Sequence, residues 1–249
     1  MELLNKYCTE LQIMPSQTDY VNRLRYHETF NIFMDLANRH AGILGIDQKT
    51  FMDKGLFWLT VKTRIRFYRR PVMSDYVQGQ TWPVRPTTLR SDRCYRLLDK
   101  DGVLAEGRTE WAVMDMKAGR LANLKELFPQ DLVFNEEPFS IEDFPRIMPC
   151  DDSFKLKNTY KVISSDIDMG QHMNNVAYVR ALMGMFSVQE LKDMDIREIT
   201  VIFKTSAHEN DVLSREILTV GLPMSIVITA VWAVYALVKS HQKSKVVSN

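Results

Sequence analysis

Cysteine is scarce in this chain, and its few cysteines are too far apart to suggest a shared site. The three residues, Cys8, Cys94 and Cys150, form neither a disulfide framework nor a CxxC metal or redox motif. A reducing cytoplasm is the location that such cysteine usage indicates. The first 14 residues also lack the continuous apolar core of a signal peptide, because charged residues interrupt them.

An excess of charge of either sign is missing as well. The chain has 32 basic and 31 acidic side chains, for a net charge of +1. Nucleic-acid-binding proteins usually carry a basic excess clustered on one face, so we expect no nucleic-acid partner. The 249 residues allow one large domain or two of about 125 residues, and either can bury a hydrophobic core.

Long apolar runs are represented by one stretch near the end of the chain. Residues 222–238 carry no formal charge, and their length is at the lower limit for a helix that crosses a bilayer. The same stretch is rich in β-branched residues, which favour strands. We therefore predict strands and no membrane association, with a tail anchor as the open alternative.

The residues that are present predict a helix followed by strands, and this order occurs twice. The first half shows helical spacing at 28–40 and strand-like runs at 57–68, 76–84, 89–98 and 103–114, with a hairpin turn at 99–102. The second half shows a strand at 158–164, a helix at 176–191, and strands at 199–204 and 212–220. Both halves therefore have a helix that precedes most of the strands.

A local alignment supports an internal repeat. The segments FYRRPVMSD, residues 67–75, and FKTSAHEND, residues 203–211, each run from a phenylalanine through a turn to an aspartate. Two copies of a long helix with an antiparallel sheet wrapped around it, an α+β fold, are the predicted architecture. The proline-containing segment 117–149 is predicted to be a linker rather than a core element. The predicted domains are 1–130 and 151–249, joined by a linker at 131–150.

The strongest candidate site lies at residues 166–175, which read DIDMGQHMNN. Acids, amides and one histidine stand there directly before an apolar segment with helical spacing. Backbone N–H groups at the start of a helix are unpaired and carry partial positive charge. This loop is therefore a candidate site for binding or hydrolysing a carbonyl compound.

The segment SDIDMGQHMNNVAYV, residues 165–179, resembles the Asp-x-Asp-x-Asn-x-His-Val-Asn-Asn signature of bacterial acyl-acyl carrier protein (acyl-ACP) thioesterases, which are related to plant plastid enzymes. Short motifs similar to those of the family also occur at 55–58, 79–82, 99–102 and 110–111. The resemblance covers roughly residues 5 to 220. It implies a tandem double hot-dog fold. It also implies hydrolysis of fatty acyl-ACP in fatty acid biosynthesis, with acyl carrier protein as partner and no metal or other cofactor.

The resemblance assigns the catalytic aspartate to Asp168 and the catalytic histidine to His172. The family's catalytic asparagine falls on Gly170, and a glutamate that the family usually carries falls on Ser206, which Ala207 follows. Asp168 is then expected to activate or orient the attacking water, and His172 to assist proton transfer to the leaving sulfur. Backbone N–H groups near residues 175 and 176 are expected to receive the oxyanion.

Several of these residues also have a structural interpretation. The pair Asn174 and Asn175 is typical of a helix cap, and Asp166 of a turn. Gly170 is compatible with a left-handed turn. His40, on the apolar stripe of the first helix, is more often a satisfied core residue than a ligand.

Three further groups carry weaker signals. Glu209, in the turn that also holds His208, is either a solvated residue or a replacement for the missing glutamate. The cluster Arg64, Arg66, Arg69 and Arg70 is predicted to be a solvated sheet face, with docking of an acidic carrier protein as its alternative. The group Met183, Met185 and Phe186 is predicted to pack in the core, and in the family this region borders the acyl tunnel.

Two other functions stay open from the sequence. Because Gly170 and Ser206 replace expected polar residues, a non-catalytic acyl-binding hot-dog module is one alternative, and an acyl-CoA thioesterase is another. The two halves are expected to pair within one chain, and a homodimer of two chains is a further possibility.

Overall fold

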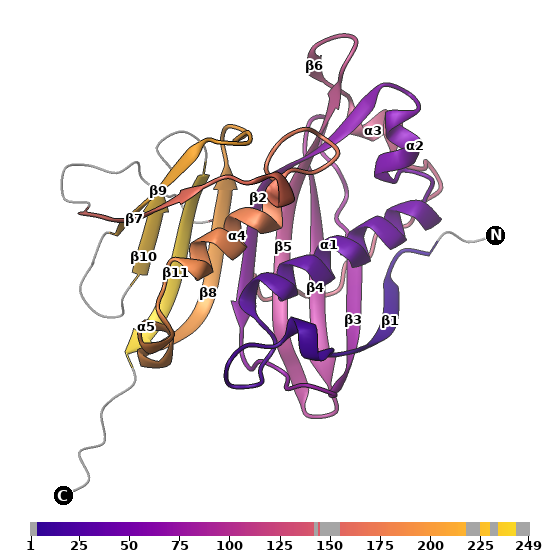
Figure 1. The fold of residues 1–249 in the computed structure, drawn as a ribbon. Coiled ribbons are helices and arrows are strands. Elements are labelled where there is room, and N and C mark those ends of the chain that lie inside the picture. The colour runs from indigo at the N-terminus through magenta and orange to yellow at the C-terminus, as the bar shows by residue number, and fades with distance from the viewer. Residues whose placement is uncertain (1–3, 142–143, 145–154, 218–224, 230–233, 243–249) are drawn as a thin grey trace, which may run out of the picture. The chain divides into compact units, whose positions relative to one another are not determined.

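The computed structural model of the protein describes residues 4–141, 144, 155–217, 225–229 and 234–242. The chain divides into two compact units, Met1–Asp143 and Phe144–Asn249. Each unit combines helices with antiparallel strands, as the predicted α+β class requires (Figure 1). The unit boundary falls within the segment predicted as a linker.

The first unit contains one five-stranded antiparallel sheet with the order β1-β3-β4-β5-β2, and a short β6 pairs with β5. Its elements are β1 (Tyr7–Gln12), α1 (Tyr26–Ile43), α2 (Gln48–Met52), β2 (Leu56–Phe67), β3 (Tyr76–Pro83), β4 (Ser91–Asp99), β5 (Gly102–Asp115), β6 (Arg120–Leu121) and α3 (Leu124–Leu127). The predicted helix, the four strands and the hairpin between β4 and β5 are confirmed.

Helix α1 packs its apolar stripe on this sheet. Phe33 is fully buried and stacks on Tyr95 of β4 with ring centroids 4.9 Å apart. Two glycines of the sheet permit this close approach. A Cβ atom on Gly107 would lie 2.6 Å from the Phe33 ring, and one on Gly79 would lie 2.9 Å from Leu36. The sheet therefore fits around the helix because it lacks side-chain atoms at the contact points.

The second unit has the elements β7 (Lys155–Lys161), α4 (Asn175–Gly184), α5 (Val188–Asp193), β8 (Met194–Phe203), β9 (Val212–Ile217), β10 (Ser225–Thr229) and β11 (Val234–Gln242). Strands β8, β11 and β10 form an antiparallel sheet, β7 pairs with β9, and β9 lies beside β10 (Figure 1). Helix α4 packs on β8 through the rings of Tyr178 and Phe203, 5.8 Å apart. Met183 and Phe186 are buried, as predicted, whereas Met185 is only half-buried.

The predicted single helix over 176–191 is wrong in its continuity. Helix α4 ends at Gly184, and α5 begins after Ser187. Ser187 and Glu190 form a capping box, in which the Glu190 N–H donates to the Ser187 hydroxyl at 3.1 Å and the Ser187 N–H donates to the Glu190 carboxylate at 2.8 Å. A Ser-x-x-Glu sequence starts a new helix in this way even inside an apolar, helix-like pattern.

The predicted strands near the end of the chain are confirmed over residues 225–229 and 234–242, which form β10 and β11. Residues 218–224 and 230–233, which belong to the same prediction, lie outside the described residues. Within the described part of the chain, no helix combines the length and apolar character that a membrane span needs.

The predicted repeat appears as matching backbone hydrogen bonds in the two units. In the first unit, the Leu24 N–H donates to the Pro71 carbonyl at 2.9 Å, and in the second the Met173 N–H donates to the Ala207 carbonyl at 2.8 Å. Pro71 and Ala207 occupy equivalent positions in the predicted alignment. Each bond ties the loop before a helix to the turn after a strand, so both helices start from the same backbone frame.

The expectation that residues 117–149 form only a linker is wrong for their first part. Leu124, Phe128 and Leu132 are buried with Phe51 and Val113 in one hydrophobic cluster. Only Leu124 of these three lies in a helix, because α3 ends at Leu127 and Phe128 has an extended backbone, so no regular periodicity in the sequence marks them as core residues. Residues 142–143 and 145–149, which belong to the same prediction, lie outside the described residues.

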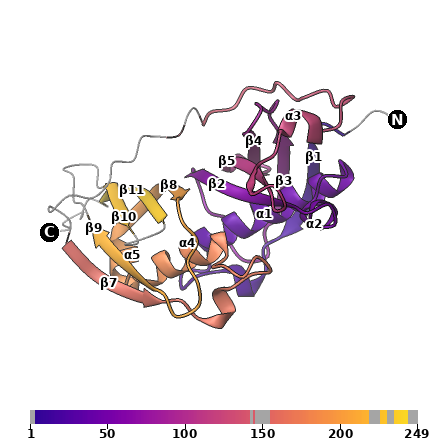
Figure 2. The same cartoon turned by 90° about the horizontal axis from the view of Figure 1, so that it is seen from above.

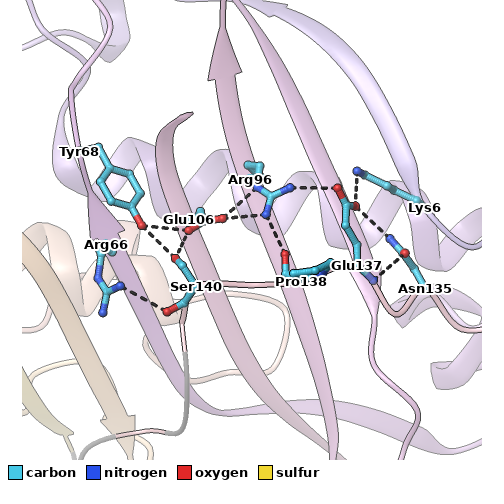
Figure 3. A network of polar contacts seen from close by, with 9 residues as sticks. All are labelled: Lys6, Arg66, Tyr68, Arg96, Glu106, Asn135, Glu137, Pro138 and Ser140. Carbon is cyan, nitrogen blue, oxygen red and sulfur yellow. Dashed lines mark hydrogen bonds and ion pairs between the residues drawn. The ribbon is translucent and has the colours of Figure 1, made fainter. Parts of the chain in front are cut away.

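Residues 135–140 lie on the side of the first sheet opposite to α1 (Figure 2). Polar contacts attach them there (Figure 3). Arg96 of β4 pairs with Glu106 of β5 at 2.9 Å and with Glu137 at 3.2 Å, and Glu137 also accepts from Lys6 at 2.6 Å. The Ser140 hydroxyl donates to Glu106. This part of the predicted linker therefore belongs structurally to the first unit.

Replacing Gly107 by alanine is expected to lower the free energy of unfolding by about 1–3 kcal/mol, because the added methyl group overlaps the buried Phe33 ring. Gly42 in α1 is the matched control, since no atom lies within 4 Å of a Cβ atom placed there. Gly42→Ala is expected to stabilise the protein by up to about 1 kcal/mol through helix propensity. Urea denaturation measures both, and equal stability of the two variants would contradict the packing argument.

Candidate functional site

The candidate loop is a tight turn between a short 3-10 helix, Ser164–Asp166, and helix α4. The Asp168 N–H donates to the His172 carbonyl and the Gln171 N–H donates to the Asp168 carbonyl, both at 3.0 Å. Gln171 has the left-handed backbone, with φ of 61°. The left-handed position is therefore one residue after Gly170, and it does not account for the glycine.

Two neutral donors hold the Asp168 carboxylate. One oxygen accepts from the Gly170 N–H at 2.8 Å, and the other accepts from the Asn174 side-chain amide at 3.3 Å. The carbonyl oxygen of the same amide accepts from the Val176 N–H at 2.8 Å. Asn174 is thus the N-cap of α4, as predicted, and it also links the carboxylate to the helix. Asn175 is the first residue of α4.

The expectation that the Val176 N–H receives an oxyanion is wrong. Val176 is buried, and its N–H is already bonded to the Asn174 side chain. A side chain that caps a helix satisfies a backbone donor that would otherwise be free for a ligand. Of the two backbone groups proposed from the sequence, the Asn175 N–H is the one that we retain.

Asp166 has a larger structural role than the predicted turn residue. It is 1% exposed, and its carboxylate accepts from the Tyr160 hydroxyl at 2.7 Å and from the Ile163 N–H at 3.0 Å. It also pairs with Arg180 of α4. Burial, and then the neighbouring Asp166, raise the pKa of Tyr160. Asp166 therefore joins β7, the 3-10 helix and α4, a role that its local sequence does not reveal.

His172 is half-buried, and its ring lies against the ring of His208, with centroids 4.9 Å apart. The loop brings Asp168 and His172 together through the backbone, and among the described residues no hydrogen bond joins their side chains. From the sequence, His208 was predicted only to adjoin a turn. The backbone bond from the Met173 N–H to the Ala207 carbonyl holds the 203–211 turn beside the loop, and this brings His208 to His172.

The turn after β8 supplies backbone groups rather than an acid. The Ala207 N–H donates to the Tyr178 hydroxyl at 2.8 Å, and the Ala207 carbonyl accepts from Met173. Ser206 and Glu209 are both exposed. The solvated interpretation of Glu209 is therefore the one that the geometry supports.

The first unit has a loop with the same backbone geometry. The Asp19 N–H donates to the Arg23 carbonyl at 2.8 Å, and Asn22 takes the left-handed conformation, with φ of 62°. The Asp19 carboxylate accepts from the Val21 N–H at 3.0 Å. Val21 occupies the position equivalent to Gly170, so the backbone there accepts even a β-branched side chain.

The two aspartates differ in their charged partners. Asp19 forms a 2.5 Å ion pair with Arg70, and Arg70 also lies over the Tyr26 ring at 4.4 Å. Asp168 instead receives neutral N–H donors, and within the described residues no cation pairs with it. The carboxylate of the first loop is thus neutralised, whereas that of the second keeps its net charge.

The prediction of a solvated arginine face is wrong in part. Arg64 of β2 is only 9% exposed. Arg69 and Arg70 follow the strand rather than lying on it, and they pair with Asp99 and Asp19. Docking of a carrier protein to this cluster stays a prediction.

His40 is a satisfied core residue, as predicted. It is completely buried, with Nε2 2.7 Å from the Leu4 carbonyl and Nδ1 3.1 Å from the Arg93 guanidinium. Burial, and then the charge of Arg93, lower the pKa of His40 to about 4. The neutral imidazole therefore donates to Leu4 through Nε2 and accepts from Arg93 through Nδ1.

Comparison with known families gives two matches along the chain. The sequence model of the acyl-ACP thioesterase N-terminal domain matches residues 4–130, and that of the acyl-ACP thioesterase C-terminal domain matches residues 151–232. The second match contains the candidate loop. The two matches together cover most of the chain.

Curated relatives are distant in sequence. The chain is 24% identical to an oleoyl-acyl carrier protein thioesterase of Coriandrum sativum chloroplasts, over 78% of this chain and 57% of the relative. It is 22% identical to a chloroplastic palmitoyl-acyl carrier protein thioesterase of Cuphea hookeriana, over 74% of this chain and 47% of the relative. The chain thus spans about half the length of the curated relatives it matches.

Solved structures share the fold. An acyl-ACP thioesterase from Bacteroides thetaiotaomicron matches with a TM-score of 0.85 at 20% identity, covering 95% of this chain and 98% of that one. The 12:0-ACP thioesterase from Umbellularia californica matches with a TM-score of 0.81 at 15% identity, covering 96% and 98%. The predicted double hot-dog fold is confirmed.

The buried His40 is expected to make stability depend on pH. Its pKa of about 4 in the folded protein lies below the ordinary value of about 6.5, so neutral His40 stabilises the fold above pH 6.5. This stabilisation is lost as the pH falls from 6.5 towards 4, by roughly 2–3 kcal/mol. Urea denaturation at pH 7 and pH 4 measures the loss. His40→Gln keeps a donor and an acceptor without titrating, and an unchanged pH dependence in this variant would contradict the assignment.

Proposed function

The chain belongs to the acyl-ACP thioesterase family, and on that premise we propose that it hydrolyses the thioester between a fatty acyl chain and acyl carrier protein. The products are a free fatty acid and holo-carrier, which places the reaction in fatty acid biosynthesis. The observation that carries this proposal is the pair of family matches over residues 4–130 and 151–232, the second of which includes the Asp168 loop.

Asp168 is the proposed base for the attacking water. Thioester hydrolysis needs a polarised carbonyl and an activated water, and a covalent protein nucleophile is not obligatory. The Gly170 N–H and the Asn174 amide fix the orientation of the carboxylate without removing its charge. A carboxylate held in this way accepts a proton from water as the water oxygen attacks the carbonyl carbon.

His172 is the proposed proton donor to the leaving sulfur. The C–S bond breaks as the carbonyl re-forms, and the thiolate of the carrier takes up a proton. Imidazole is suited to this step because it changes protonation near neutral pH. The Asn175 N–H at the start of α4 is the proposed donor to the oxyanion, since the first backbone N–H groups of a helix have no partner within it.

A non-catalytic acyl-binding role is the second candidate, because Gly170 and Ser206 stand where the family has an asparagine and a glutamate. Hydrolysis of acyl-CoA is the third. Purified protein assayed with acyl-ACP and acyl-CoA over a series of chain lengths separates all three. Turnover of acyl-ACP supports the proposal, turnover of acyl-CoA alone supports the third candidate, and acyl binding without turnover supports the second.

Location and assembly are further parts of this proposal. A cytoplasmic location is supported by the free thiols of Cys8 and Cys94, since unpaired cysteines are typical of reducing compartments. Cys150 lies outside the described residues. The assignment of residues 1–130 and 151–249 as two hot-dog domains and the formation of a homodimer both stay predictions. Analytical ultracentrifugation of the purified protein measures the oligomeric state and so tests the homodimer.

Asp168→Asn is expected to lower kcat by about 10²–10⁴-fold, because its amide oxygen still accepts from the Gly170 N–H but the amide cannot act as a base. Asp19→Asn in the equivalent loop of the first unit is the matched control, and its kcat is expected to stay within about threefold of the wild type. Steady-state hydrolysis of acyl-ACP, measured below the melting temperature of each variant, tests both. Near wild-type turnover by Asp168→Asn would remove the proposed base.

Gly170→Asn restores the amide that the family signature carries. The variant is expected to fold, because Val21 occupies the equivalent position of the first loop. We expect kcat to rise by about tenfold, the effect of one added hydrogen bond of about 1.4 kcal/mol to the reacting groups. Gly170→Ala, which adds a side chain without an amide, controls for backbone effects. Equal kcat values for the two variants would show that the missing amide does not limit the rate.

A further inference from the structure

A partly open cavity of about 130 Å³ lies in the first unit. Its apolar wall includes Met34 and Ala37 from α1, Trp58 from β2, and Phe128 after α3. An engineered cavity of about 150 Å³ in another protein holds one benzene molecule, so this cavity accommodates roughly a six-carbon segment of a ligand. Its size and lining suit part of an aliphatic chain.

A buried positive charge also lines this cavity. Arg93 of β4 is 6% exposed, and its guanidinium contacts the His40 imidazole at 3.1 Å and the Thr81 hydroxyl at 3.4 Å. Both partners are neutral. The Thr81 hydroxyl carries no charge, and burial keeps the pKa of His40 at about 4. Among the described residues, no carboxylate pairs with Arg93. Burial lowers the pKa of Arg93, which reflects the same uncompensated environment.

A second donor on the cavity wall has no acceptor. Gln48, at the start of α2, lines the cavity, and its side-chain oxygen accepts from the backbone N–H of Trp58 at 3.2 Å. Its side-chain nitrogen is buried and makes no hydrogen bond within the described part of the chain. Buried polar groups of native proteins are almost always paired, so an apolar cavity with two incompletely satisfied donors is unusual.

These features complement a ligand that is aliphatic and ends in an anionic acceptor. Lone buried charges are strongly unfavourable until a counter-charge binds them. A planar guanidinium matches the two oxygens of a carboxylate better than it matches a hydroxyl or a carbonyl group. We propose that the cavity binds a carboxylate group carried on an aliphatic chain, with Arg93 and Gln48 as its donors.

The aliphatic class rests on the proposed thioesterase function, and it has two sources with the same chemistry. One is an acyl chain on the carrier that bears a second carboxylate at its far end, so that the cavity selects a substrate. The other is a free fatty acid, so that the cavity binds the reaction product. Arg93 is a binding residue in both cases and takes no part in the chemical step.

Isothermal titration calorimetry of the full chain with octanoate and with 1-octanol tests the site without any thioester. The wild type is expected to bind octanoate about tenfold or more tightly than octanol, since hydrogen bonds to charged groups contribute more than neutral ones. In Arg93→Met this preference is expected to fall to within about twofold. Equal affinities in the wild type, or an undiminished preference in Arg93→Met, would overturn the proposal.

Two further variants provide a second test of the site and a control. Gln48→Glu keeps the acceptor for the Trp58 N–H but brings a negative charge to the cavity, so it is expected to weaken octanoate binding and leave octanol binding unchanged. It decides the question if Arg93→Met does not fold, and unchanged octanoate binding by this variant would count against the site. Arg69→Met removes an exposed arginine elsewhere, and loss of octanoate binding in this control would show non-specific attraction instead.

Turnover measurements then assign the source. If the cavity selects substrates, the wild type hydrolyses ω-carboxyoctanoyl-ACP with a higher kcat/KM than octanoyl-ACP, and Arg93→Met loses this preference. If the cavity binds the product, octanoate inhibits the wild type and Arg93→Met is less inhibited. Absence of all hydrolysis would refute the proposed function alone, because the calorimetric result does not depend on catalysis.

Discussion

The backbone hydrogen bond between the loop before each helix and the turn after a strand is the constraint on which this structure depends. It joins Leu24 to Pro71 in the first unit and Met173 to Ala207 in the second. Because the bond is formed by backbone groups, it tolerates different side chains on both sides. It fixes where each helix begins, and it thereby fixes where a carboxylate at the preceding turn is presented.

The two loops show how the same frame supports different chemistry. In the first, the Asp19 carboxylate forms an ion pair with Arg70. In the second, Asp168 receives only N–H groups from Gly170 and Asn174. The difference lies in one charged partner that comes from a distant strand end, so it cannot be read from either loop alone.

The sequence predicted the features that depend on local periodicity and on turn residues. Helix α1, most strands, the β4–β5 hairpin, the Asn174 cap and the core position of His40 were all available in this way. Features that depend on tertiary contacts could not be predicted from the sequence. The burial of Asp166 against Tyr160 and Arg180 depends on side chains that meet only after folding.

Prolines and charges also concealed structure that was present. Phe128 and Leu132 are buried in the core of the first unit, yet Pro129 between them makes the segment resemble a linker. Arg93 of β4 is buried although its side chain is charged. In such cases the local composition is misleading, because neighbours distant in the sequence determine the burial of each side chain.

The lining of the cavity by Trp58 and Trp111 has an optical consequence. The chain has four tryptophans, and these two lie with ring centroids 6.0 Å apart in an edge-to-face arrangement. Indole emission depends on the polarity and the quenching groups around the ring, and two indoles this close exchange excitation energy. The protein therefore contains an intrinsic fluorophore pair at the wall of its cavity, and its emission spectrum reports on the cavity contents without an added dye.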